Sequence, residues 1–191
     1  MKNKHILPEA FYDGLSISNK LGDTLIDFRK EEIHLFSYFS SILFLYKGNP
    51  IADWKYSFIL DSNGYPFSDA LDEVIKRHIL NGLIKEGNNF LRITTKGINE
   101  FLFFKEMQNL SKREEFIKAA CFTNIILPYS KTMRSLLNDP EITKIKNIAS
   151  KQNLDIDNVY QEFSKLSKAI GVNANDLVIP AVTWINYISE R

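Results

Sequence analysis

The amino-acid sequence predicts a mainly α-helical protein with one small β-hairpin. Apolar residues recur at helical spacing through most of the 191 residues, and only one segment alternates around a turn as paired strands do. Six prolines and eight glycines leave few breaks, and 45% apolar residues are enough for a folded core. The single cysteine excludes an internal disulfide and a cysteine-based structural zinc site.

A central helix is predicted from about residue 31 to residue 46. Glu31 and Glu32 stand in its first turn, where negative charge favours the helix dipole. Apolar residues cover most of its circumference, which is typical of a helix buried in a core. The preceding residues 1–30 are mixed in composition and contain two glycines. They predict an irregular N-terminal arm that leads into this helix.

A short helix is expected over residues 51–60, followed by a turn at residues 61–64. A longer amphipathic helix is predicted over residues 68–82, because Ser68 is a typical N-cap and Gly82 a typical stop. Its apolar residues have the spacing i, i+3, i+4, i+7, i+8 of one helical face. This face consists of Leu71, Val74, Ile75, His78 and Ile79.

A β-hairpin is predicted directly after this helix. Residues 83–86 and 90–94 form its two strands, and a Gly-Asn-Asn sequence between them forms the turn. Thr94 or Thr95 then caps a further helix that runs to about residue 107.

The order helix, helix, helix, hairpin and helix within residues 31–109 is that of a winged helix-turn-helix domain. The sharp stop after the third helix allows the hairpin, or wing, to fold back on it. An unrelated small α+β domain is the alternative. Residues 110–191 predict a C-terminal helical region, which either forms a separate domain or packs as one unit with the winged helix.

Caps and prolines set the helix boundaries in the C-terminal region. One helix is predicted from about residue 112 to residue 126, with Lys112–Glu115 as a solvated start. Three further starts are expected from N-cap residues and from proline in the first turn. The first of these helices starts at Asp139-Pro140-Glu141. The second starts at Asp155 or Asp157 and ends at Gly171. The third starts at about Asn175, has Pro180 in its early part and ends at Ser189.

The charge distribution argues against a dedicated nucleic-acid binder. The chain has 24 basic and 23 acidic residues, a net charge of +1. The helix over residues 68–82, in the position of a recognition helix, carries two basic residues against three acidic ones. DNA is therefore expected only as a secondary contact. The candidate nucleic-acid contacts are Lys76, Arg77, Arg92 and Lys96.

No set of residues predicts catalysis, a cofactor or a metal site. His5, His34 and His78 are far apart and form no metal-binding motif, and no glycine-rich phosphate loop is present. His78 lies on an apolar face and is expected to be packed, whereas His34 is expected at a cap or on the surface. Cys121 has apolar neighbours, which favours an unreactive thiol. The chain is therefore predicted not to be an enzyme.

Six short stretches of the chain carry a resemblance to a known family. They are Leu45-Tyr46-Lys47-Gly48-Asn49-Pro50, Tyr65-Pro66-Phe67-Ser68-Asp69-Ala70-Leu71, Leu80-Asn81-Gly82-Leu83-Ile84, Ile93-Thr94-Thr95-Lys96-Gly97, Arg113–Ala120 and Leu137–Ile142. With them, residues 31–142 resemble the middle, accessory components of bacterial ABC three-component defence systems, which include Lamassu-type systems. The resemblance implies a non-catalytic adaptor subunit that bridges an SMC/ABC-type ATPase and an effector such as a nuclease.

The same segment is similar to the Panacea domain of antitoxins. It departs from that pattern because Tyr65-Pro66-Phe67 stands where Gly-Pro usually precedes the serine. A winged-helix transcription regulator or antitoxin that binds DNA is therefore the alternative function. The chain shows neither the apolar run of a signal peptide nor that of a membrane span, so we expect a cytoplasmic protein without membrane contacts.

Overall fold

Helices α1 and α2 lie at the centre of the structure, a computed structural model that describes residues 6–148, 153–170 and 176–190. The described helices are α1 (Pro8–Leu25), α2 (Lys30–Tyr46), the 3-10 turn η1 (Ile51–Trp54), α3 (Asp69–Leu80), α4 (Thr95–Lys105), α5 (Gln108–Ile126), α6 (Tyr129–Leu137), α7 (Pro140–Ile148), α8 (Ile156–Ile170) and α9 (Val178–Ser189). Antiparallel hairpins form from β1 (Ile59–Leu60) with β2 (Pro66–Phe67), and from β3 (Ile84–Gly87) with β4 (Phe90–Ile93). The mainly helical prediction is confirmed.

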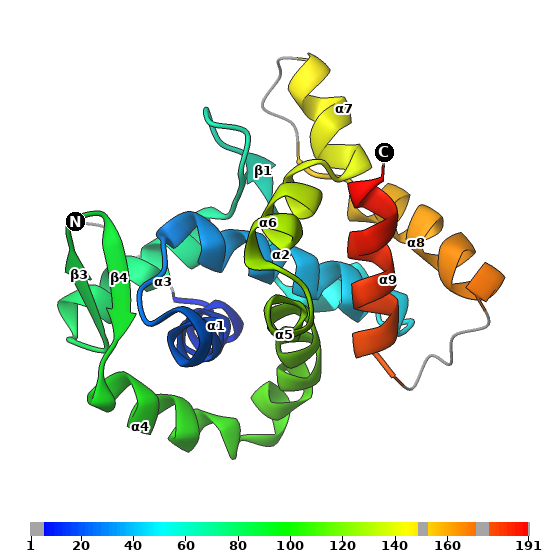
Figure 1. The fold of residues 1–191 in the computed structure, drawn as a ribbon. Coiled ribbons are helices and arrows are strands. Elements are labelled where there is room, and N and C mark those ends of the chain that lie inside the picture. The colour runs from blue at the N-terminus through cyan, green and yellow to red at the C-terminus, as the bar shows by residue number, and fades with distance from the viewer. Residues whose placement is uncertain (1–5, 149–152, 171–175, 191) are drawn as a thin grey trace.

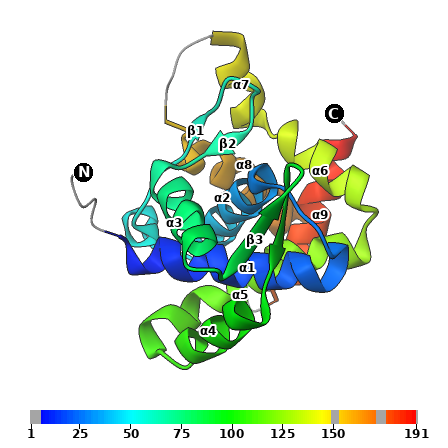
Figure 2. The same cartoon turned by 90° about the vertical axis from the view of Figure 1, so that its left-hand side faces the viewer.

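The N-terminal arm predicted for residues 1–30 is wrong for the part that the structure describes, from residue 6 onward, because α1 is a core helix. Helices α3, α4 and α5 surround it in Figure 1, and Figure 2 shows it lengthwise between α4 and the β3–β4 hairpin. The two glycines that suggested irregular structure are contact points. A Cβ at Gly14 would lie 3.1 Å from Nε2 of His78, and one at Gly22 would lie 3.0 Å from Cγ2 of Ile93. Both glycines therefore allow neighbouring elements to approach α1 closely.

The short helix predicted over residues 51–60 is also wrong beyond its first turn. Lys55 adopts a left-handed backbone with φ of 77°, which ends η1 after the buried Trp54. Ile59 and Leu60 instead pair with Phe67 and Pro66 in an antiparallel hairpin. The sequence predicted one hairpin and missed this one, because two-residue strands carry no alternating pattern.

The predicted β3–β4 hairpin and the start of α4 are confirmed. Asn88 and Asn89 have φ of 48° and 68°, the paired left-handed conformations that a tight two-residue hairpin turn requires. Thr94 Oγ1 accepts the backbone N–H of Gly97 at 3.1 Å and so caps α4. Phe28 pairs with Leu91 through two backbone hydrogen bonds, which tie the chain between α1 and α2 to β4.

The C-terminal helices share one hydrophobic core with the N-terminal ones. The buried cluster runs from Tyr12 in α1 through α2 and α5 to Ile188 in α9. Helix α8 begins at Ile156, close to the start predicted at Asp155 or Asp157, and α9 begins at Val178 with Pro180 in its first turn. The predicted end at Gly171 and start at Asn175 lie outside the described residues. Among those residues, no helix has the length and apolar character of a bilayer-crossing segment.

Asp139 caps α7, as its position before Pro140 predicted. Its Oδ1 accepts the N–H of Glu141 at 2.9 Å and the hydroxyl of Tyr38 at 3.3 Å. The side chain is fully buried, and Oδ2 has no hydrogen-bond partner among the described residues. Burial raises the pKa of Asp139 to about 7.

Replacing Asp139 by Asn should make the unfolding free energy less sensitive to pH between about 4 and 7. The pKa of the folded carboxyl, about 7, lies above its ordinary value of 3.8, so the folded chain binds more protons across this range. The protonated Asp139 carboxyl therefore makes its full contribution to stability below the ordinary pKa of 3.8, and this contribution is lost as pH rises through the folded pKa of about 7. Asn keeps an N-cap oxygen but does not titrate. Urea unfolding at several pH values measures the difference, and parallel profiles for the two proteins would contradict the assignment.

Candidate functional site

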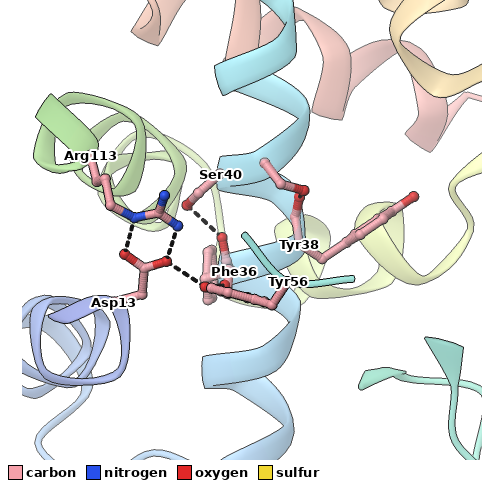
Figure 3. Close-up of polar contacts among 8 residues, drawn as sticks. Asp13, Phe36, Tyr38, Ser40, Tyr56 and Arg113 are labelled. Atoms are coloured by element: carbon pink, nitrogen blue, oxygen red, sulfur yellow. Dashed lines mark hydrogen bonds and ion pairs between the residues drawn. The ribbon is translucent and has the colours of Figure 1, made fainter. Parts of the chain in front are cut away.

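The interface between α1 and α5 is held by a buried ion pair. Asp13 from α1 and Arg113 from α5 form two parallel bonds, Nε to Oδ1 at 2.7 Å and Nη2 to Oδ2 at 2.5 Å (Figure 3). Both side chains are buried. This two-pronged geometry is the strong form of an arginine–carboxylate contact, and it joins segments 100 residues apart in the chain.

Aromatic residues from the η1 region complete this cluster. The hydroxyl of Tyr56 donates to Asp13 Oδ2 and lies 2.7 Å from the hydroxyl of Ser37 in α2 (Figure 3 shows the Asp13 contact). Burial and the neighbouring Asp13 carboxylate raise the pKa of Tyr56, which keeps it a donor. The Arg113 guanidinium lies over the Trp54 ring, 3.8 Å from its centre. Because its charges are paired and buried, we assign this cluster a structural role.

The solvated helix start predicted for Lys112–Glu115 is wrong for its two middle residues. Helix α5 begins at Gln108, so Arg113 and Glu114 lie in its second turn and face α1. Glu114 accepts hydrogen bonds from Tyr12 at 2.7 Å and Ser16 at 2.6 Å, and pairs with Lys20. The sequence offered no signal for these contacts, because their partners lie in the segment expected to be an arm.

A groove of about 380 Å³ lies between the C-terminal half of α1, α4 and α5. Leu102, Phe122 and Ile125 line it and are 50%, 37% and 59% exposed. Phe101 and Cys121 also line the groove but are buried. Large apolar side chains gathered in a concave site are a common feature of binding surfaces.

The helix registers explain why these apolar side chains face outward. Phe101 turns toward α1, with its ring 6.0 Å from that of Tyr12, and so leaves its neighbour Leu102 exposed. On α5, the buried stripe that includes Ala119, Ala120 and Thr123 faces the core. Phe122 and Ile125 lie off this stripe. This departure from the buried spacing is the one signal in the sequence that could have indicated the groove.

The four candidate nucleic-acid contacts all engage groups of the protein itself. On α3, Lys76 pairs with Asp72 at 2.8 Å and Arg77 with Glu73 at 3.4 Å. Arg92 on β4 makes two 2.8 Å bonds to Asp27, and Lys96 on α4 donates to the Asn81 carbonyl at 2.9 Å. Among the described residues, these cations form no shared unpaired set that could follow a phosphate backbone.

A second groove, of about 970 Å³, lies beside the β3–β4 hairpin, the start of α2 and the first turn of α6. Two basic and four acidic side chains line it, a balance of 2 − 4 = −2. They are Arg29 and Lys30 against Asp27, Glu31, Glu32 and Glu86. This charge does not favour a polyanion such as DNA at the face beside the hairpin.

Among the described residues, His34, His78 and Cys121 are all buried. Burial lowers the pKa of both His34 and His78 to about 4 and raises that of Cys121 to about 12. The packed position expected for His78 is confirmed, with Nε2 3.1 Å from the Phe11 carbonyl. His34 is buried rather than superficial, and its Nδ1 accepts the N–H of Ser68 at the start of α3.

Within the described ranges, no three His, Cys, Asp or Glu side chains come together as a metal site. His5 lies outside these ranges. The groove between α1, α4 and α5 brings exposed apolar side chains together with charged ones. No protein-family model matches the chain, and the comparisons with curated proteins and with solved structures found no match either.

Proposed function

We propose that this protein is a non-catalytic accessory subunit of a bacterial anti-phage or anti-plasmid defence complex. It would act in the cytoplasm as an adaptor between an SMC/ABC-type ATPase and an effector such as a nuclease. The observation that carries the proposal is the open groove with Leu102, Phe122 and Ile125 exposed in it. Aromatic and apolar side chains of this kind form the buried centres of protein–protein interfaces.

A winged-helix domain would suit the adaptor hypothesis. In this structure such a domain would begin with α1 and not at residue 31, where the sequence predicted its start. Helix α1 packs against both α2 and α3, and the β3–β4 hairpin follows α3. Phe28, between α1 and α2, pairs with β4 in the place of a short first strand. In this arrangement Arg92 on the wing and Lys76 and Arg77 on the third helix are paired with carboxylates, which suits a scaffold.

The alternative is a winged-helix transcription regulator or antitoxin that binds DNA. The contacts of Lys76 with Asp72 and of Arg92 with Asp27 make it less favoured, because phosphate binding would have to replace them. Such a protein would act as a dimer on paired half-sites without other proteins.

Purification of the tagged full chain from its native host at physiological salt tests the proposal. We expect mass spectrometry to identify a coiled-coil ATPase in near-stoichiometric amount, together with an effector protein. The variant with Lys76, Arg77, Arg92 and Lys96 all replaced by Ala should keep these partners, because the groove is intact. A dimer that purifies without other proteins and binds one DNA sequence in a salt-sensitive way would contradict the proposal.

A further inference from the structure

We propose that the groove between α1, α4 and α5 binds an amphipathic helix of a partner protein, with carboxylates flanking the helix's apolar stripe. The inference rests on the proposed function and adds the chemistry of the partner at the same site. It is carried by the lining of the groove by three helices, by its exposed apolar side chains and by the two unpaired lysines that line it.

The groove is lined by three helices. Its walls come from two helices, α4 with Leu102 and α5 with Phe122 and Ile125, and α1 contributes the third side. Phe122 and Ile125 are three residues apart on one helix face of α5, and Leu102 lines the same groove from α4. A helix that presents apolar residues at i, i+3, i+4 and i+7 fills such a site with successive anchors.

The charges around the groove select an acidic partner. Lys105 and Lys118 line it, are exposed, and have no salt-bridge or hydrogen-bond partner among the described residues. Lys20 is already paired with Glu114 and lies 5.1 Å from the centre of the Phe101 ring. Asp23 is the one other charged lining residue, so the unpaired charges sum to 2 − 1 = +1. Carboxylates beside the apolar stripe of the partner would complement the two free lysines.

A membrane surface fits these observations less well than a helix. The apolar side chains line a concave site rather than one projecting face. Anionic bilayers are recognised by clusters of several basic residues, whereas this rim offers two free lysines and an aspartate. A bilayer would also leave the Lys20–Glu114 pair facing lipid.

Fluorescence anisotropy with labelled helical peptides tests the inference. The probe is a peptide of about 16 residues with leucines at i, i+3, i+4 and i+7 spacing and glutamates on both sides of the leucine stripe. The matched control peptide carries lysines in place of the glutamates. The full chain should bind the glutamate peptide about tenfold more tightly than the lysine peptide. Phe122→Ala should weaken binding of the glutamate peptide by about tenfold or more.

Charge reversal separates this inference from simple hydrophobic adhesion. The double variant Lys105→Glu/Lys118→Glu should prefer the lysine peptide, whereas the control Lys55→Glu/Lys85→Glu, at exposed lysines outside the groove, should behave as the unmodified chain. Equal affinity for both peptides, no binding up to about millimolar concentration, or binding to phosphatidylserine vesicles that Phe122→Ala abolishes would overturn it. The proposed function fails separately, if no partner protein purifies with the chain from its host.

Discussion

Replacing Arg113 by Met should lower the free energy of unfolding by about 3–5 kcal/mol, because the substitution leaves the Asp13 carboxylate buried without its partner. Asp13 would keep only the hydroxyl of Tyr56 as a donor from the described cluster. Met retains most of the side-chain volume over Trp54, so the loss should come mainly from the charge. Urea unfolding followed by circular dichroism measures it.

The double variant Asp13→Leu/Arg113→Met is the matched control. It removes both charges, and we expect it to recover most of the stability that the single variant loses. A loss of less than about 1 kcal/mol in Arg113→Met would contradict the structural role of the pair. Equal losses in the single and double variants would instead assign the cost to packing.

Replacing Gly97 by Ala should destabilise the protein by about 1–3 kcal/mol, although Ala favours helices. A Cβ at this position would overlap the carbonyl oxygen of Leu83 and lie 3.0 Å from Cγ1 of Ile93. The Leu83 carbonyl accepts both the N–H and the hydroxyl of Thr94, the residue that caps α4. The added Cβ would therefore clash with backbone atoms where the hairpin meets α4. The backbone cannot move aside as a flexible side chain would.

Gly87→Ala is the control for this prediction. Gly87 ends β3, and a Cβ there would meet nothing within 4 Å. Its stability should change by less than about 1 kcal/mol. Thermal unfolding of the two variants compares them directly, and equal stability would argue against close contact between α4 and β3.

Local signals in the sequence predicted the elements whose geometry is set locally. The Asn88-Asn89 turn, the Thr94 cap and the Asp139-Pro140 start lie where their backbone preferences place them. Gly14 wrongly indicated irregular structure, because its role depends on the close approach of His78 from α3. A glycine inside a core helix cannot be distinguished from one in a loop without knowing that contact.

The structural ion pair and the candidate groove were less predictable than the fold. Asp13 and Arg113 are 100 residues apart, so no local pattern connects them. The exposure of Leu102 and Phe122 depends on which faces of α4 and α5 turn toward α1. The paired state of Lys76 and Arg77, by contrast, follows from acidic residues four positions earlier on the same helix.

Partner capture by a groove variant tests the central claim most directly. The tagged chain, Phe122→Glu, and Leu80→Glu would be purified in parallel from the native host, and their co-purifying proteins quantified by mass spectrometry. Leu80 lies on α3 outside the groove and is 84% exposed, so it is a matched apolar-to-acidic control. We predict that Phe122→Glu loses the partner by about tenfold or more while Leu80→Glu retains it. Undiminished capture by Phe122→Glu, with its fold intact by circular dichroism, would contradict the assignment of the groove as the docking site.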